Sequence, residues 1–337
     1  MNIRKRNLPL DLFKVFLAFL VICIHFAGEA YDHFPLYRLA VPMFFMISGY
    51  FNYHADGEIR KKRAKTLISR TVNYMIIGFG IYIVYDFFLC YAEGKGVGYY
   101  FTTLFHDDLF LDFFVLNTPI TYSGYQLWFL IALFVLSLVH FLVVKYRKEK
   151  WYYLLVPCLI AVYLFFSGYM RLLQYTDMPI RYTRNAMVFG LPNFALGYLL
   201  AKHMGQKRVN LPKKLLFLAL GILFFFLQIA ESRIVVMEMY VSTVLSAIFF
   251  LLFFTSLGTT KGAIYYKLCG KDLSFYIYVL HVAVGITLGK FFTFENLYLK
   301  CLLILGLSIF LYEIGYLLSG PIKKALCRLY GKIPDFS

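Results

Sequence analysis

The sequence predicts an all-α integral membrane protein, a bundle of about ten transmembrane helices with both termini in the cytoplasm. Three observations lead to this prediction. Of the 337 residues, 61% are hydrophobic and 15% are charged, which leaves too little polar surface for a water-soluble domain of this size. Apolar runs of about 20 residues, the length that crosses a bilayer as a helix, recur along the whole chain. The positive charges lie mostly in short segments between these runs.

The apolar runs place ten spans along the chain, with boundaries good to about three residues. We expect one domain over residues 1–337 and no appended soluble domain. Arg4, Lys5 and Arg6 precede the first run as in a signal peptide, but Asp11 and Lys14 within the run indicate an uncleaved helix. The predicted spans are residues 9–27, 38–54, 72–92, 126–144, 152–169, 186–201, 214–230, 236–257, 273–289 and 297–318.

The distribution of positive charge orients these spans. The formal net charge is +16, and most of the 34 Lys and Arg residues fall in alternate connecting segments, which are therefore cytoplasmic. Charge distributed over short loops argues against a nucleic-acid partner, whereas the basic tail suits anionic lipid headgroups. The predicted inner segments are residues 1–8, 55–71, 145–151, 202–213, 258–272 and 319–337.

Cysteines and acidic residues give no metal site. The six cysteines form no CxxC pair and no zinc-type cluster, so we expect small buried hydrophobic side chains. The longest outer loop, residues 92–125, is aromatic enough to fold back over the mouth of a site. It contains His106, Asp107, Asp108 and Asp112, for which a solvated or helix-capping acidic face is favoured over a metal centre.

The first span carries ionisable residues inside an apolar run. Lys14 and His25 are eleven residues apart, which places them on nearly one helix face and about 16 Å apart along the axis. Ionisable groups within membrane helices usually face a cavity or a partner. We therefore expect this helix to line a polar path across the bilayer, with Asp11 available as an ion partner for Lys14. A neutral imidazole such as His25 accepts a proton from an attacking hydroxyl, although a lone histidine can also be purely structural.

The second span begins with Arg38. This side chain either reaches the outer headgroups or offers a cationic fork to a carboxylate, a phosphate or a developing oxyanion. Pro42 inside the span frees a backbone carbonyl, which a helix bundle tolerates where a helix lines a cavity. Ser48 lies toward the inner half of the same span.

Further polar residues lie on later spans. Arg181, Arg184 and Asn185 precede the sixth span and either grip an anionic acceptor or lie among headgroups. Trp128 lies at an interface, where aromatic belts are common. In the ninth span, Tyr278 and His281 share one face. His281 is there either a hydrogen-bonded structural histidine or a second catalytic group. Glu313 in the last span is a further inward-facing candidate.

These stretches together resemble acyltransferase family 3. Lys14 and His25 match the family's pattern of Arg or Lys, ten residues and His. Four later stretches follow in order and at family-like spacing, so that the resemblance covers nearly the whole chain. They are RLAVPMFFMISGYF from Arg38, YQLWFLIALF from Tyr125, TRNAMVFGLPNFALGYLL from Thr183 and LSFYIYVLHVAV from Leu273.

The resemblance implies a ten-helix membrane protein that transfers acyl groups, most often acetyl, to hydroxyls of envelope carbohydrates. The donor would be cytoplasmic acetyl-CoA or another acyl-CoA, with no permanently bound cofactor, and the acceptor an envelope glycan or lipid-linked saccharide. The location would be the bacterial cytoplasmic membrane. His25 would correspond to the essential histidine and Lys14 to its basic partner, while Arg38 and Ser48 fall in the second motif.

The departures from the family pattern are specific. Lys14 stands where Arg is commoner, which removes a bidentate contact, and Gln126 stands where many members have His. Two stretches, RLAVPMFFMISGY and TRNAMVFGLPNFALG, also resemble the membrane part of vancomycin-resistance serine racemases, in which the related domain serves amino-acid supply.

Three hypotheses follow from these observations. In the first, acyl-CoA binds from the basic inner side, His25 acts as general base or accepts the acyl group itself, and Arg38 stabilises charge at the carbonyl. The second is a transporter of a serine-like amino acid or an acylated glycan. The third is a membrane scaffold for envelope synthesis. The membrane-bound O-acyltransferase fold fits less well, because its Asn and buried His pair is not evident.

Overall fold

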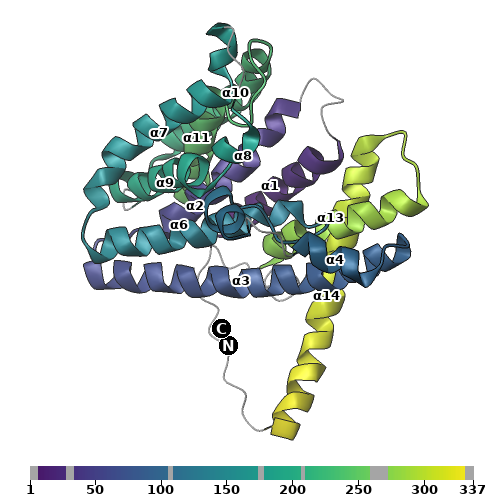
Figure 1. Cartoon of the computed structure of the whole chain (residues 1–337). Coiled ribbons are helices and arrows are strands. Elements are labelled where there is room, and N and C mark those ends of the chain that lie inside the picture. Colours follow the sequence, from purple (N-terminus) through teal and green to yellow (C-terminus); the bar gives the residue numbers. More distant parts are fainter. Residues whose placement is uncertain are drawn as a thin grey trace.

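The computed structural model describes residues 7–27, 34–104, 109–173, 178–205, 209–258 and 272–330, and within these ranges all regular structure is helical (Figure 1). Each of the ten predicted spans coincides with one helix. These helices are α1 (Leu8–Phe26), α2 (Ala40–Asn52), α3 (Gly57–Ala92), α6 (Trp128–Lys145), α7 (Tyr152–Ser167), α9 (Leu191–Met204), α10 (Leu211–Ser232), α11 (Val241–Ser256), α13 (Leu273–Phe291) and α14 (Leu297–Tyr330).

Seven of these helices are long and apolar enough to cross a membrane. The exceptions are α2, α9 and α11, which have 13, 14 and 16 residues. Two of them are extended by tighter or wider turns: a 3₁₀ helix, η2 (Phe34–Leu39), leads into α2, and a π-helix, η7 (Ala186–Gly190), leads into α9. The all-helical membrane fold is therefore confirmed, while the count of ten spans and the cytoplasmic termini stay predictions.

Pro42 marks the start of α2 rather than its interior. The α-helix begins at Ala40, so Pro42 lies in the first turn, where a backbone N–H would have no partner within the helix. The expectation that Pro42 frees a backbone carbonyl within the span stays a prediction. The proline accompanies the change from the 3₁₀ turn to the α-helix.

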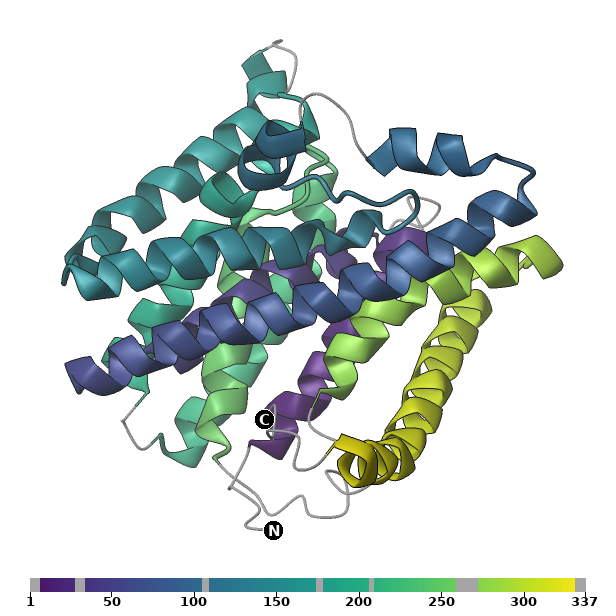
Figure 2. The same ribbon diagram turned by 60° about the horizontal axis from the view of Figure 1, so that its bottom comes forward.

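Helix α1 is the centre of the bundle. It contacts α13 and α14 on one side and α2, η2 and α11 on the other. Figure 2 shows α3 and α6 side by side along one flank, with α13 and α14 beyond α1. The side chains of α1 that face these neighbours are apolar and buried, so the helix is held by packing along most of its length.

Two glycines allow α2 and α9 to touch through their backbones. A Cβ atom at Gly49 would lie 1.9 Å from the carbonyl oxygen of Phe194, and one at Gly197 would lie 2.0 Å from that of Met46. Small residues permit this approach between membrane helices, where dispersion contacts drive association. The contact joins the helix that follows Arg38 to the helix that follows Arg184.

The helix ends form two groups. At the ends that the sequence predicts to be cytoplasmic, Asn7 Nδ2 donates to the carbonyl of Phe254 at 2.8 Å, and Arg60 pairs with Glu149 at 3.1 Å. At the opposite ends, Glu93 after α3 pairs with Lys290 in α13 at 3.0 Å.

Glu93 is also bound by its own neighbours. It receives hydrogen bonds from Lys95 and Tyr122, and together with the bond from Lys290 these lower its pKa to about 2. The carboxylate is thus ionised at neutral pH and links α3, the following loop and α13.

The loop between α3 and α6, which the sequence predicts to be outer, includes α4 (Val97–Leu104), α5 (Leu109–Leu111) and a π-helix, η3 (Asp112–Leu116). Asn117 accepts from Ala186 N at 2.7 Å, which ties the loop to the start of η7. His106, Asp107 and Asp108 lie outside the described residues. Within the described part of the chain, no group of three or more metal-ligating side chains occurs.

The described cysteines lie mostly where the sequence predicts. Cys23, Cys90 and Cys301 are buried free thiols. Cys158 is exposed on α7, so the expectation of a buried side chain is wrong there. Its apolar helix face can be exposed because lipid, rather than water, would cover it.

Candidate active site

Polar side chains from six parts of the fold meet at the helix ends opposite those that the sequence predicts to be cytoplasmic. They come from the end of α1, from η2, from the start of α6, from the residues flanking α9 and α11, and from the middle of α13. The cluster comprises His25, Arg38, Tyr125, Trp128, Arg184, Glu238, Tyr278 and His281.

Two histidines lie side by side in this cluster. The ring centroids of His25 and His281 are 5.3 Å apart with an angle of 26° between the planes, and the Tyr125 ring meets His25 edge-on at 5.0 Å. Gly285 makes the approach of α1 to α13 possible, since a Cβ atom there would lie 2.1 Å from the Phe26 ring. The sequence predicted both histidines, but their contact depends on this close helix packing.

The hydrogen bonding of His281 fixes its tautomer. Its Nδ1 lies 2.7 Å from the carbonyl oxygen of Tyr278, and because a carbonyl only accepts, Nδ1 carries the proton. The other nitrogen, Nε2, then presents a lone pair. His281 is completely buried, and Nε2 has no hydrogen-bond partner among the described residues.

Two arginines converge on one carboxylate oxygen. Nη1 of Arg38 is 3.0 Å and Nη1 of Arg184 is 3.4 Å from Oε1 of Glu238. The guanidinium of Arg184 also lies over the Trp128 ring, 5.2 Å from its centroid. Both guanidinium groups are close enough to His25 to act on it electrostatically.

Sequence reasoning missed Glu238. The residue falls within the predicted span 236–257, where an ionisable group in an apolar run is itself a signal of a functional position. In the structure it precedes α11 and its side chain is mostly buried between the two arginines.

A hydrogen-bond network holds the start of α6 between α3 and α13. The Tyr82 hydroxyl donates to the carbonyl of Val279 at 3.0 Å and accepts from Gln126 Nε2 at 2.6 Å. The Tyr278 hydroxyl donates to the carbonyl of Gln126. This network places Tyr125 beside His25.

Asp86 anchors the loop that leads into α6. This fully buried carboxylate of α3 accepts from the backbone N–H of Tyr122 at 2.9 Å and of Ser123 at 3.2 Å, and from the Ser123 hydroxyl. Sequence reasoning missed Asp86 as well, although it lies within the predicted span 72–92.

Lys14 lies apart from the cluster. It pairs with Asp11 at 2.8 Å, as expected, and its ammonium is 5.9 Å from the centroid of the Phe51 ring at the far end of α2. Four α1 side chains on the face that carries Lys14 and His25 are closely packed, with at most 3% exposed. They are Leu17, Ala18, Val21 and Ile22. The expected polar path along α1 is therefore absent in this conformation, because apolar packing closes it.

Three other predicted site residues make local contacts. Ser48 donates to the carbonyl of Phe44 in its own helix at 2.9 Å. The Arg181 guanidinium lies 4.9 Å from the centroid of its exposed neighbour Tyr182. Asn185 caps η7, accepting from the backbone N–H of Met187 and Val188 at 3.0 Å. Their roles in substrate binding stay predictions.

Glu313 in α14 is half-buried, and its Oε1 has no hydrogen-bond partner among the described residues. It has no contact with the His25 cluster in the structure. The inward-facing role proposed from the sequence stays a prediction.

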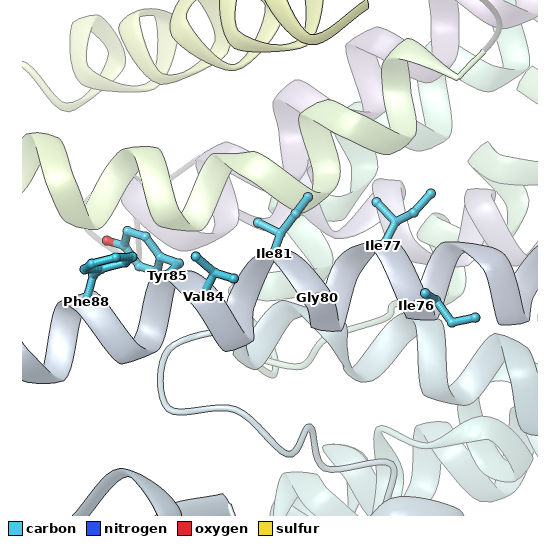
Figure 3. A pocket seen from close by; sticks show the side chains of 7 residues that line it. All are labelled: Ile76, Ile77, Gly80, Ile81, Val84, Tyr85 and Phe88. Atoms are coloured by element: carbon cyan, nitrogen blue, oxygen red, sulfur yellow. The ribbon is translucent and has the colours of Figure 1, made fainter. Parts of the chain in front are cut away.

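A separate groove of about 650 Å³ lies along α3 (Figure 3). Its lining is apolar apart from the Tyr85 hydroxyl, and it contains no residue of the His25 cluster, so the polar chemistry lies elsewhere. The lining residues are Ile76, Ile77, Gly80, Ile81, Val84, Tyr85 and Phe88.

Comparison with known proteins gives one result. The sequence model of the family described as "Acyltransferase domain" matches residues 7–318, nearly the whole chain and all of the His25 cluster. No curated protein and no solved structure matches.

Proposed function

The chain belongs to acyltransferase family 3, and we propose that it is a membrane O-acetyltransferase. It takes an acetyl group from cytoplasmic acetyl-CoA and delivers it to a hydroxyl of a cell-envelope or exported glycan. The location is the bacterial cytoplasmic membrane. Acetyl-CoA is a substrate, and the proposal includes no permanently bound cofactor, no metal and no nucleic acid.

The observation that carries this proposal is the position of His25. It lies against a second imidazole and within electrostatic range of two guanidinium groups. Acyl transfer needs either a base that deprotonates the hydroxyl or a nucleophile that attacks the thioester. It also needs fixed positive charge where the carbonyl oxygen becomes an oxyanion. One cluster supplies both requirements.

The reaction proceeds by transfer of the acetyl carbon from sulfur to oxygen. The thioester C–S bond breaks, the new C–O bond forms, and the hydroxyl proton ends on the CoA sulfur. Arg38 and Arg184 face the developing negative charge, and His25 is the reactive imidazole. A positive charge already held in a site of low dielectric stabilises an oxyanion more strongly than water does.

The donor reaches His25 from the basic side of the protein. The basic segments and Lys14 meet the phosphates of CoA there, and the acyl-pantetheine arm extends toward the opposite helix ends. Because Leu17, Ala18, Val21 and Ile22 are packed, this extension requires the neighbours of α1 to move apart. The acceptor approaches from the side of Tyr125, whose exposed ring covers His25.

The test is CoA release from acetyl-CoA by the purified protein in detergent. We expect slow acetyl-CoA hydrolysis by the wild type, with a loss of at least about 100-fold in His25→Ala. His203→Ala is the control, because this exposed histidine lies at the opposite end of the bundle, hydrogen-bonded to Tyr153. A His25→Ala rate equal to that of the wild type would overturn the assignment. Absence of acetyl-CoA binding by every form would favour the transport of a serine-like amino acid.

A further inference from the structure

His281 has an unused basic nitrogen at the reaction centre. Its Nδ1–H is held by the carbonyl of Tyr278, so Nε2 is the acceptor, and Nε2 is buried without a hydrogen-bond partner among the described residues. A buried acceptor is normally satisfied, because its desolvation is otherwise uncompensated. An imidazole with one nitrogen oriented and the other free has the arrangement of a general base.

A second acceptor in the same network points to the same kind of ligand. Gln126 donates through Nε2 to the Tyr82 hydroxyl, while its Oε1 is buried without a partner among the described residues. The Tyr278 hydroxyl links this residue to the helix of His281. Both unfilled positions accept hydrogen, so the missing ligand is a donor such as a hydroxyl group.

The polar groups near His25 differ from those near His281, and this difference suggests a different role for each imidazole. A proton on His25 would add positive charge near Arg38 and Arg184. A second proton on His281 would bind to Nε2, while its Nδ1–H continues to donate to the carbonyl of Tyr278. Because its Nδ1–H is fixed by this carbonyl and its Nε2 has no hydrogen-bond partner among the described residues, His281 is assigned the proton transfer, and His25 is assigned the acyl group.

On the basis of the proposed function, we infer that His281 is a second catalytic residue and that the two imidazoles divide the transfer between them. His25 carries the acetyl group, and Nε2 of His281 removes the proton of the acceptor hydroxyl. The reaction then has two steps, with an acetyl group on His25 as the intermediate.

The two steps balance as follows. A ring nitrogen of His25 attacks the thioester, its C–N bond forms as the C–S bond breaks, and the ring proton of His25 passes to the CoA thiolate. The acceptor oxygen then attacks the acetyl carbon while its proton moves to Nε2 of His281. The C–N bond breaks, its electron pair returns to His25, and His281 gives the proton to His25.

Single-turnover kinetics in detergent test this division, with acetyl-[³H]-CoA as donor and water as acceptor. We expect His281→Gln to release about one CoA per protein at close to the wild-type rate and then to stop. Its later turnover falls at least about 100-fold, and label accumulates on the protein. Hydroxylamine attacks acyl-imidazole without a general base, so it restores turnover.

Tyr276→Phe is the control on the same helix, because its ring packs against Tyr312 of α14 instead.

The outcomes separate the inference from the proposed function. Steady turnover of His281→Gln at the wild-type rate would overturn the inference while leaving acyl transfer intact. Failure of the wild type to release CoA would overturn the proposed function. If the variant fails to fold, rapid quench and peptide mapping of the wild type decide the matter: label on His25 supports the inference, and label on any other residue or on none contradicts it.

Discussion

Glu238 joins the two arginines of the site, because its single negative charge lies between their two positive charges. Arg38 and Arg184 both approach its Oε1, so the carboxylate reduces their mutual repulsion and fixes where they point. Removal of one partner from a mostly buried ion pair usually costs more than the pair contributes, because the remaining charge stays desolvated. Glu238 thereby positions the two guanidinium groups of the His25 cluster.

Glu238→Gln tests this role at the level of one residue. The amide keeps the size of the side chain but removes its charge, so we expect the free energy of unfolding to fall by about 1–3 kcal/mol. CoA release falls by about 10–100-fold as the guanidinium groups shift away from His25. Thermal unfolding and the CoA assay measure the two effects. Glu295→Gln, at an exposed position, is the matched control, and a Glu238→Gln protein as stable and active as this control would contradict the account.

The sequence predicted most single residues of the site but not their convergence. His25, Arg38 and His281 stand out because ionisable side chains are rare in apolar runs, and Arg184 stands out because it precedes such a run. Their meeting depends on contacts between segments far apart in the chain. Glu238 is part of one such contact, and it was missed although it also lies inside an apolar run.

Ser48 shows what a motif position leaves open at the same scale. A serine in a helix satisfies its hydroxyl with the carbonyl four residues earlier, as Ser48 does with Phe44. A motif position alone therefore does not show that the hydroxyl faces a substrate. Only the hydrogen-bond partner distinguishes the two cases.

Helices α2 and α9, which follow the two arginines of the site, touch through their backbones. Arg38 immediately precedes α2, and Arg184 lies shortly before α9, so the fit of these two helices sets the distance between the arginines. The fit requires glycine at positions 49 and 197.

Gly49→Ala tests the α2–α9 contact. The added methyl group would meet the Phe194 carbonyl at 1.9 Å, so the helices must separate. We expect a loss of about 2–4 kcal/mol in the free energy of unfolding, with lower CoA release. Gly80→Ala on α3 is the control, because nothing lies within 4 Å of its added Cβ and alanine favours the helix by about 0.5–1 kcal/mol. Equal melting temperatures for Gly49→Ala and the wild type would refute the tight contact.

Element positions were predictable from apolar run length, whereas element lengths were not. All ten runs are helical, but α2, α9 and α11 are shorter than a typical span. For α2 and α9 the reason is local: η2 and η7 lead into these two helices with 3₁₀ and π turns, which hydropathy does not distinguish from α-helix. Conversely, α3 has 36 residues because its polar first turns continue the helix beyond the apolar run.

At the scale of the whole molecule, described basic residues such as Arg60 and Lys145 lie at the helix ends opposite the His25 cluster. This separation suits a reaction in which the donor comes from one side of the membrane and the acceptor from the other. The packed interval on α1 keeps the sides apart in the present conformation. Acetyl groups would then cross the membrane only when bound acetyl-CoA has separated α1 from its neighbouring helices.

Sealed membrane vesicles of both orientations test this central claim most directly. Radiolabelled acetyl-CoA added outside meets the cytoplasmic face only in inverted vesicles. The account predicts CoA release and labelled carbohydrate or acetate inside inverted vesicles, none in right-side-out vesicles until they are permeabilised, and none in either orientation with His25→Ala. Equal activity in both sealed orientations, or activity that persists in His25→Ala, would contradict it.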